Sequence, residues 1–465
     1  MRRRPSVARR GAIGVALAAL ACLAALGPRY GGRVSVGVLD LSSEASPTFT
    51  LNRGARLLAA LRHETLVTID AVGALTPSLA EHWSTSADGR EWTLDLAETA
   101  RFHDERPVTV EDALRSLRRF LRSNSPAAAV LAAQLEGGGD FRRGATETLS
   151  GLASAAPRRV VLRMANPGAS PLTPLAAPAA AITSTEGAGC GPFAPAHIMR
   201  GERATLMAFD QHVRGRPFVD NVELVRYPDP AALRLALEQG AVQAVVGDGR
   251  GTPLVARLLL LLDREREAFR GLAARRRVAE AIDRDLLVRR FLPGGQPTCR
   301  LVAAVAHAPC DSPLRSAPAP AAATAIVLNV DSSIDPLTSQ RVVAHLVALG
   351  HRVRVVVLSP DAVVSSPADA RLLLWCPEVD DALLALHELA LLSHALNAPE
   401  QAALAVESTP TAGRPTRDEL ERSILATHTV LPLAVAPLAA IGPKLIAARV
   451  TTGGLLLLED VWLPL

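Results

Sequence analysis

The sequence predicts an α/β protein built from two or three lobes. It has 465 residues, of which 49% are apolar. A single hydrophobic core stops growing at about 250 to 300 residues, so this chain can fill more than one core. Ala325 to Val330 and Arg352 to Leu358 are strand-like, and Leu337 to Leu349 between them has a helical pattern that Gly350 ends. A strand–helix–strand unit of this kind is typical of an α/β lobe.

The amino terminus has the pattern of an export signal. No acidic residue precedes the first apolar run, and five arginines do: Arg2, Arg3, Arg4, Arg9 and Arg10. The apolar run from Gly11 to Gly27 has 17 residues, which lies at the lower edge of the length that spans a bilayer. We therefore expect export, with residues 1–30 forming either a cleaved signal peptide or an uncleaved anchor followed by a linker.

The basic charge of the chain belongs to this leader. The formal net charge is +4. Without residues 1–21 the chain has 45 basic and 46 acidic residues, a net charge of −1. A nucleic-acid partner is therefore not expected, because nucleic-acid binding requires a positively charged surface.

The five cysteines also suit an exported protein. Cys22 ends an Ala-Leu-Ala-Cys segment that resembles a bacterial lipoprotein box, so it is either lipidated or one more small apolar residue. Cys299 and Cys310 enclose a short Pro- and Ala-rich loop and are candidates for a local disulfide. No zinc-type spacing or His-Glu-x-x-His sequence occurs, so neither a metal site nor a cofactor is expected.

Several local patterns predict the elements of the first half of the chain. Asp88-Gly89 is a hairpin turn signal, and the strand after it alternates apolar Trp92, Leu94 and Leu96 with polar residues. Thr109 is a helix cap, with acidic residues in the first turn. The helix places these residues on one face: Ala113, Leu114, Leu117, Phe120 and Leu121. Further on, a helix from Ala231 to Glu238 is closed by Gly240.

Two blocks of this sequence resemble family 5 of the extracellular solute-binding proteins, the periplasmic oligopeptide, dipeptide and nickel binders of ABC importers. In the first block the matching residues are Pro77, Leu79, Ala80, Glu81, Trp83, Ser86, Asp88, Gly89, Trp92, Thr93, Leu94, Phe102, His103, Asp104, Pro107, Thr109, Glu111 and Asp112. In the second they are Gly189, Gly191, Pro192, Phe193, Gly215, Pro217, Asp220, Val222, Pro228, Asp229, Ala232, Leu235 and Gly240. The chain departs from the family pattern at Glu105, where the family has glycine, and at Gln243, where it has aspartate.

The resemblance implies a two-lobed periplasmic binding protein of type II, with an extra domain inserted in the first lobe. It divides the chain into lobe I (31–63, 180–265 and 430–465), the inserted domain (64–179) and lobe II (266–429). Ligand would be trapped between the lobes by hinge closure and delivered to an ABC permease in the inner membrane. The protein would be a monomer in the periplasm or at the cell surface, anchored through lipid on Cys22 or through an uncleaved helix.

The resemblance also implies a site for the amino terminus of a peptide ligand, because an acidic residue of the second lobe pairs with it in peptide-binding members. Asp380 and Asp381, with Trp375 nearby, are the candidates, since a buried ammonium group needs a paired carboxylate. The alternative is that these aspartates cap a helix that begins near Ala382.

We therefore expect a binding protein for a peptide-like or related small solute, and not an enzyme. Aromatic residues make up only 3% of the chain, and Lys444 is the one lysine, so charged recognition falls to arginine. These departures leave a degenerate paralogue, ligand-free or partner-binding, as the alternative. A periplasmic hydrolase is disfavoured because no Gly-x-Ser-x-Gly sequence places a nucleophile.

Overall fold

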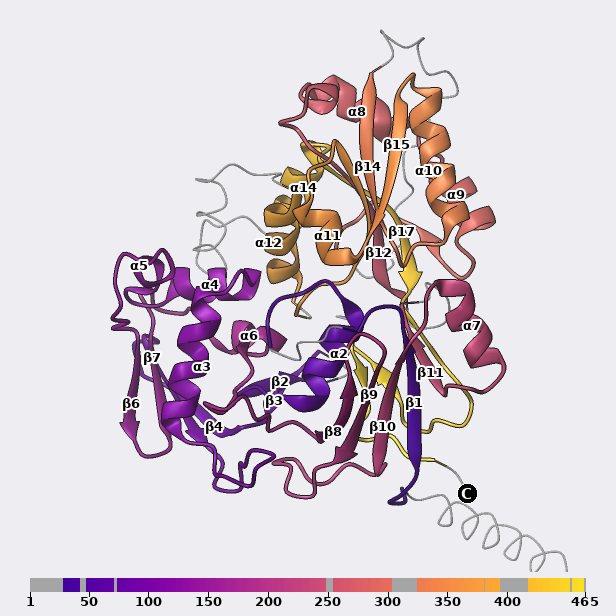
Figure 1. Ribbon diagram of the computed structural model, residues 1–465. Coiled ribbons are helices and arrows are strands. Elements are labelled where there is room, and N and C mark those ends of the chain that lie inside the picture. The colour runs from indigo at the N-terminus through magenta and orange to yellow at the C-terminus, as the bar shows by residue number, and fades with distance from the viewer. Residues whose placement is uncertain are drawn as a thin grey trace, which may run out of the picture.

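The protein has two stacked lobes, with a third domain beside the lower lobe (Figure 1). The computed structural model describes residues 28–41, 47–70, 73–247, 254–302, 324–379, 381–393, 417–451 and 454–463. Each lobe contains a six-stranded sheet, and the third domain contains a four-stranded sheet. The predicted α/β class and the two-lobed arrangement are confirmed.

Lobe I is built on a sheet with the order β18-β11-β1-β10-β9-β8. Its strands are β1 (Arg33–Val38), β8 (Phe193–Met199), β9 (Arg203–Ala208), β10 (Asn221–Arg226), β11 (Ala244–Val246) and β18 (Ala439–Ile441). β1 pairs in parallel with β10 and β11, and its Val34, Val36 and Val38 are fully buried. Lobe I also contains α2 (Arg53–Arg62), α7 (Pro230–Glu238) and the hairpin of β19 (Arg449–Val450) and β20 (Leu456–Leu457).

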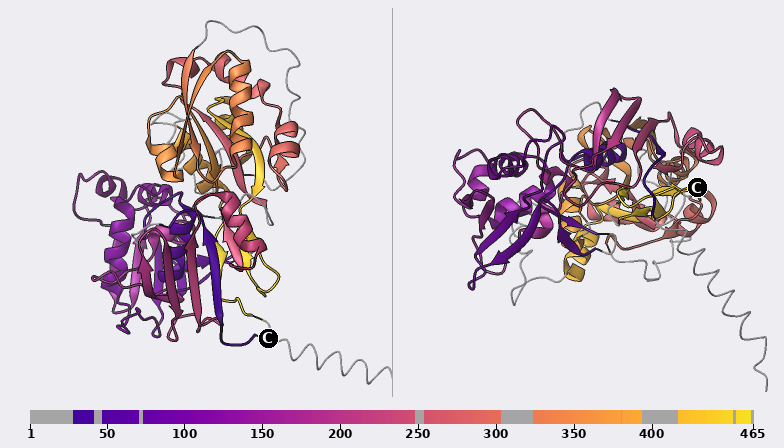
Figure 2. Two further views of the ribbon diagram at one scale, coloured as in Figure 1. Left: turned by 45° about the vertical axis from the view of Figure 1, so that its right-hand side comes forward. Right: turned by 90° about the horizontal axis from the view of Figure 1, so that it is seen from below.

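The inserted domain lies between α2 and β8 in the chain and has a core of its own, which contains Phe102, Phe120 and Phe141. Its sheet has the order β4-β5-β7-β6. The elements are β2 (Val67–Ile69), β3 (Leu75–Pro77), β4 (Ala80–Thr85), β5 (Glu91–Leu96), α3 (Val110–Arg122), α4 (Pro126–Gln134), α5 (Gly138–Arg142), β6 (Leu152–Ala156), β7 (Arg159–Arg163), α6 (Leu172–Leu175) and a 3₁₀ turn at Pro178–Ala180. Seen from below, this domain projects to one side of the stacked lobes (Figure 2).

Lobe II is built on a sheet with the order β13-β17-β12-β16-β14-β15. Its strands are β12 (Leu254–Leu262), β13 (Gln296–Pro297), β14 (Ala325–Asp331), β15 (Arg352–Leu358), β16 (Ala370–Trp375) and β17 (Val430–Pro437). One face is covered by α8 (Leu272–Ala281), α9 (Arg284–Phe291) and α10 (Pro336–Ala348). The other face carries α11 (Pro360–Ser365), α12 (Ala382–Ser393) and α14 (Arg417–Ala426), with a 3₁₀ turn at Glu267–Phe269 before α8.

The two lobes are joined where neighbouring strands cross from one sheet to the other. β11 of lobe I leads to β12 of lobe II, and β17 of lobe II leads back to β18 of lobe I. β12 pairs with β17, and β11 pairs with β18. Between the sheets, the Gly247 N–H donates to the Leu438 carbonyl at 2.7 Å. Two adjacent crossings of this kind form a hinge about which the lobes can move.

The sheets place the lobe boundaries differently from the sequence-based division. β12 and β17 are strands of the second sheet, so the lobes divide between Val246 and Leu254 and between Pro437 and Ala439. The predicted boundaries at residues 265 and 429 would put both strands in lobe I. An apolar run predicts a buried strand but does not say which of two sheets receives it.

The local predictions in the first half of the chain are confirmed. β4 and β5 form an antiparallel hairpin, with Gly89 at a φ of 68° in its turn. The Thr109 hydroxyl accepts from the Asp112 N–H at 3.2 Å, and the Asp112 carboxylate accepts from the Thr109 N–H, which forms a capping box at the start of α3. The α7 helix begins at the Asp229 cap and is followed by Gly240 at a φ of 69°.

Glu105 occupies a backbone conformation that glycine prefers. Its φ is 67°, in the left-handed region where a Cβ crowds the backbone. The turn after Phe102 needs a positive φ at this position, which explains why the family pattern has glycine here.

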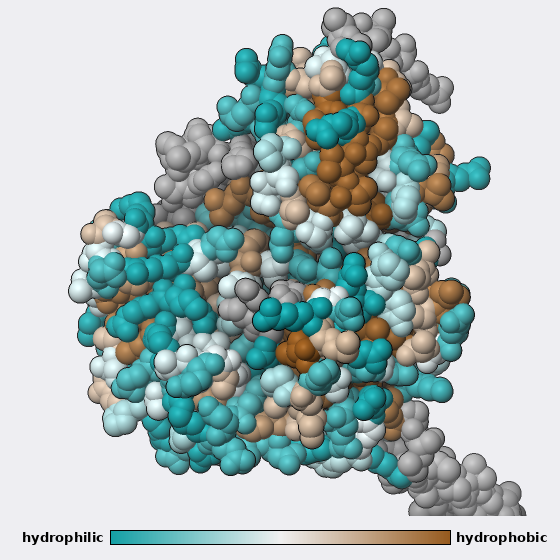
Figure 3. All heavy atoms as spheres, viewed as in Figure 1, coloured by the Kyte–Doolittle hydropathy of each residue, from teal (hydrophilic) through white to brown (hydrophobic). Residues whose placement is uncertain are grey.

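Lobe II exposes apolar side chains along its outer edge strand. Val355 and Val357 of β15 are 43% and 62% exposed, and a hydrophobic patch covers this region of the upper lobe (Figure 3). Arg352 and Arg354 lie in the same strand and are exposed. Charged side chains on an edge strand oppose pairing with the edge of another sheet.

Candidate functional site

The candidate site is the junction between the two lobes. β1 and β10 run in parallel in lobe I, and β14 and β16 run in parallel in lobe II. The carboxyl ends of these strands face the junction, since residues that follow β14 and β16 contact α2, which follows β1. In open α/β sheets, ligands bind in the crevice at the carboxyl ends of parallel strands.

Arg53, in the first turn of α2, crosses this junction. One guanidinium nitrogen donates to the Ser333 hydroxyl at 2.8 Å. The other lies 3.4 Å from the Asp331 carboxylate and also donates to the carbonyl of Leu374. Arg53 is 8% exposed and Asp331 is fully buried. This arginine therefore joins lobe I to the ends of two strands of lobe II.

Arg56 makes a second connection one turn further along α2. Its guanidinium donates to the carbonyls of Cys376, at 3.3 Å, and of Pro377, at 2.8 Å. Both carbonyls belong to the segment that leaves β16. Since residues three apart on a helix lie on the same face, Arg53 and Arg56 approach lobe II side by side.

Three further contacts surround the two arginines. The Leu51 N–H donates to the Asp361 carboxylate at 2.6 Å. The Ser125 hydroxyl, at the cap of α4 in the inserted domain, donates to Glu378 at 2.7 Å. Arg234 of α7 lies 3.6 Å from Asp335 at the start of α10. Three parts of the molecule therefore contact lobe II: the inserted domain, the segment before α2 and helix α7.

Asp40, which follows β1, lies among these charges. Burial raises its pKa above the usual range, the negative charge of Asp331 raises it further, and Arg53 opposes both effects. Asp40 of lobe I and Asp331 of lobe II thus both interact with the positive charge of Arg53.

Glu388 of α12 supports the lobe II side of the junction. It is fully buried, and its two oxygens accept from the Trp375 indole N–H at 2.6 Å and from the Glu378 backbone N–H at 2.8 Å. Burial raises the pKa of Glu388 to about 7, and these N–H donors offset only part of that rise.

The raised pKa predicts that Glu388 makes folding pH-dependent. The folded pKa lies above the ordinary value of 4.5, so the stability that this group contributes is complete below about pH 4.5 and is lost as the pH rises through about 7. Between pH 5 and pH 8 the free energy of unfolding should fall in the wild type by about 2–3 kcal/mol more than it does in Glu388→Gln. Glu147→Gln, at an exposed glutamate, is the control, and equal pH profiles for all three proteins would contradict the prediction.

The structure places the candidate ligand residues as follows. Trp375 is 1% exposed, inside lobe II. Asp381 caps α12, and its carboxylate accepts from the N–H groups of Leu383 and Leu384, both at 2.9 Å. Asp380 lies outside the described residues. Asp381 therefore caps the helix, as the alternative interpretation predicts. A ligand role for Trp375, Asp380 and Asp381 stays a prediction.

Arg53 and Arg56 are residues of the site that sequence reasoning missed. Their partners lie 278 to 322 positions away in the chain, and no local pattern marks such pairs. The available signal was compositional, since a chain with one lysine must make its charged contacts through arginine.

The cysteines fall into two groups. Cys299 is disulfide-bonded, whereas Cys190 and Cys376 are free and buried, and burial raises the pKa of the Cys376 thiol. Cys310 and Cys22 lie outside the described residues, so the Cys299–Cys310 pairing and the lipidation of Cys22 stay predictions.

Within the described ranges, no cluster of side chains suits a metal ion. No described helix is long and apolar enough to cross a bilayer.

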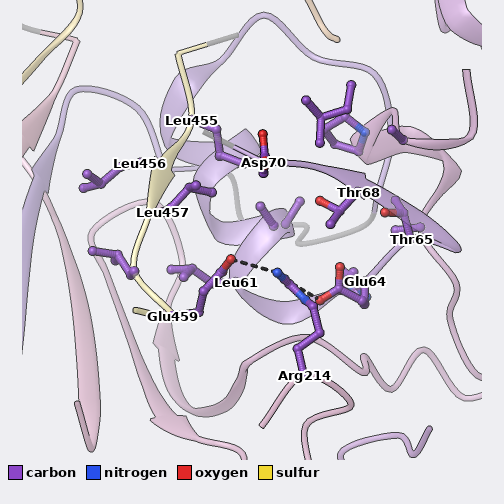
Figure 4. Close-up of a pocket in the computed structure, with 18 of the residues that line it drawn as sticks. Leu61, Glu64, Thr65, Thr68, Asp70, Arg214, Leu455, Leu456, Leu457 and Glu459 are labelled. Atoms are coloured by element: carbon purple, nitrogen blue, oxygen red, sulfur yellow. Dashed lines mark hydrogen bonds and ion pairs between the residues drawn. The ribbon is translucent and has the colours of Figure 1, made fainter. Parts of the chain in front are cut away.

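A separate cavity of about 160 Å³ lies where lobe I meets the inserted domain, between the end of α2, β2 and the β19–β20 hairpin (Figure 4). Leu455 and Leu457 line one side, and Glu64 and Arg214 line another. Arg214 joins two carboxylates, at 3.1 Å from Glu64 and 3.0 Å from Glu459.

Glu64, which lines this cavity, is bound by Arg214 and His212. It is 6% exposed, and its carboxylate also lies 2.9 Å from Nε2 of His212. Burial raises its pKa, but the charge of Arg214 and the contact with His212 outweigh burial and lower the pKa to about 2. Glu64 is therefore a buried and paired carboxylate, although it directly follows a helix end. The cluster ties α2 to the segment before β10 and to the carboxyl-terminal hairpin.

Comparisons with known proteins agree with this architecture. The chain is 28% identical over 170 residues to the probable D,D-dipeptide-binding periplasmic protein DdpA of Escherichia coli K12, a match that covers 35% of this chain and about a third (32%) of that protein. The Escherichia coli murein tripeptide binding protein MppA has a TM-score of 0.79 at 15% identity, covering 93% of this chain and 98% of that one. Haemophilus influenzae OppA, solved with RPPGFSPFR, has a TM-score of 0.76 at 14% identity with the same coverage, 93% and 98%.

The profile of the bacterial extracellular solute-binding proteins, family 5 (middle region), matches residues 74–326, which is more than half of the chain. The matched segment includes most of the inserted domain, most of the lobe I sheet and the crossing from β11 to β12. The chain belongs to the bacterial extracellular solute-binding proteins of family 5.

Proposed function

We propose that this protein captures a peptide-like or related small solute between its two lobes and delivers it to the permease of an ABC importer. The observation that carries the proposal is the hinge: two adjacent strand crossings join the lobes, and the carboxyl ends of parallel strands from both sheets face the junction. A protein of this build can close around a ligand. The function is binding, with no bond-breaking step.

The chemistry of the relatives favours a peptide-like solute. DdpA is described as binding D,D-dipeptides and MppA as binding a murein tripeptide, and OppA was solved with the peptide RPPGFSPFR. In this chain the lobe II side of the junction supplies carboxylates, among them Asp331 and Asp361. A solute with an ammonium group can pair with such carboxylates when the lobes are open. Asp380 and Asp381 stay candidates for the ammonium group.

The proposal includes a location outside the cytoplasm. The arginine-rich, apolar leader supports export to the periplasm or the cell surface. Attachment to the membrane would come from lipid on Cys22 or from an uncleaved amino-terminal helix. The working unit would be a monomer that docks on an inner-membrane permease.

The test is thermal unfolding of the purified full chain with pools of di- to pentapeptides, nickel chelates and short oligosaccharides. A ligand at about 100 times its dissociation constant stabilises the folded state by about 2.7 kcal/mol. We expect a peptide pool to raise the melting temperature and the oligosaccharide pool to leave it unchanged. A well-folded sample that responds to no pool would contradict solute binding and favour a ligand-free, partner-binding role.

A further inference from the structure

The polar contacts between the lobes described above all run in one direction. Lobe I and its inserted domain supply the donors, which are Arg53, Arg56, Arg234, the Leu51 N–H and the Ser125 hydroxyl. Lobe II supplies the acceptors, which are Asp331, Ser333, Asp335, Asp361, Glu378 and the carbonyls of Leu374, Cys376 and Pro377. Apart from Asp40, a lobe I carboxyl that lies near Asp331 and Asp361, the residues on the two sides of the junction are complementary in charge and in hydrogen bonding.

We propose that Arg53 and Arg56 form a clasp that holds the two lobes together through direct contacts, without a solute to bridge them. The inference goes beyond solute capture, because it concerns what closes the hinge and not what the hinge encloses. Both guanidinium groups lie on one face of α2, and both residues are under a tenth exposed. A planar guanidinium donates several hydrogen bonds in a fixed geometry, which suits carboxylate and carbonyl acceptors on two strand ends.

The partners on lobe II make the clasp strong. The Asp331 carboxylate is itself oriented, since one oxygen accepts from both the N–H and the hydroxyl of Ser333, at 2.9 and 2.7 Å. The other oxygen accepts from the Leu374 N–H at 3.2 Å and faces Arg53. An acceptor held in place this way loses little freedom when the lobes close. Because the pair is buried, salt screens it less than it screens a surface ion pair.

The clasp sets the affinity for any solute that must enter the junction. A solute binds only to molecules that are open, so its apparent affinity falls in proportion to the open fraction. If about 1% of the molecules are open, the apparent dissociation constant is about 100 times the intrinsic one. Arg53 and Arg56 are in this sense positioning residues, which control binding through the hinge.

Small-angle X-ray scattering of the full chain tests the clasp. We expect the wild type to have the compact radius of gyration of the arrangement in Figure 1, and Arg53→Ala/Arg56→Ala to have a larger one. The control is Arg143→Ala/Arg276→Ala, which removes two guanidinium groups from exposed ion pairs away from the junction and should scatter like the wild type. Arg53→Lys/Arg56→Lys keeps both charges but lacks the planar fork, and should be intermediate.

Two results would overturn the clasp: a wild type as extended as the alanine variant, or both clasp variants as compact as the wild type. The lysine variant decides the matter if the alanine variant unfolds. Titration with the peptide pools is a separate arm. If the alanine variant raises the fraction of open molecules from about 1% to about 50%, the apparent affinity rises about 50-fold. If no pool binds either protein, the proposed solute function fails, while the scattering result still decides the clasp.

Discussion

Replacing Arg214 with alanine is expected to lower the free energy of unfolding by about 3–5 kcal/mol. Glu64 would then be a buried carboxylate without the cation that lies 3.1 Å from it, and the neutral partners beside it would not replace that charge. Removing one partner of a buried ion pair is expensive because the other charge has already left water. Urea unfolding at pH 7 measures the loss.

Arg143→Ala is the matched control for this prediction. It removes a guanidinium whose ion pair with Asp140 is 71% and 61% exposed on its two sides, and exposed pairs contribute at most about 1 kcal/mol. A loss as small in Arg214→Ala as in the control would contradict a structural role for the cluster.

The same cluster predicts acid sensitivity. The pKa of Glu64 is lowered from 4.5 to about 2 in the folded protein, so the stability it contributes is present above about pH 4.5 and is lost as the pH falls through about 2. Its effect thus has the opposite sign to that of Glu388. In Arg214→Ala the pKa of Glu64 should move back toward or above 4.5, so less stability should be lost below about pH 4.5 than in the wild type.

Local structure could be predicted from the sequence because its causes are local. The cap at Thr109 and the turn at Gly89 depend on residues within a few positions of one another. Glu105 was also visible in the sequence as an exception to the family pattern. The structure shows what the exception means, because Glu105 has a φ of 67°, a value that favours glycine. The two-lobed fold came from the resemblance and not from composition, which bounded only the number of cores.

The site could not be predicted in the same way, because its contacts join distant parts of the chain. Arg53 meets Leu374 across 321 positions, and Arg214 meets Glu64 across 150. An arginine in a helix looks the same in sequence whether it faces water or a second lobe. The acidic pair after Trp375 had a local signal, but helix capping and ligand binding use the same residue type, and the structure assigns Asp381 to the cap.

Gly191→Ala is expected to lower the free energy of unfolding by more than about 4 kcal/mol, the range in which a single substitution indicates a severe defect. A Cβ at Gly191 would lie 2.6 Å from the Arg62 carbonyl carbon and from the His63 nitrogen, and 2.7 Å from the Leu61 oxygen. All three are backbone atoms, which cannot rotate away as a side chain can. The Gly191 N–H also donates to the Arg62 carbonyl at 3.0 Å, so the two segments cannot separate without losing that bond.

Gly187→Ala separates this clash from the ordinary strain of replacing a glycine. Gly187 has a φ of +83° with nothing within 4 Å of an added Cβ, so its substitution introduces only left-handed strain of about 1–2 kcal/mol. Comparable losses at both positions, measured by urea unfolding, would show that the packing against α2 is not tight. A much larger loss at Gly191 would show that this glycine fixes the end of α2. Because the same helix carries Arg53 and Arg56 to lobe II, Gly191→Ala would then disturb the clasp as well as the fold.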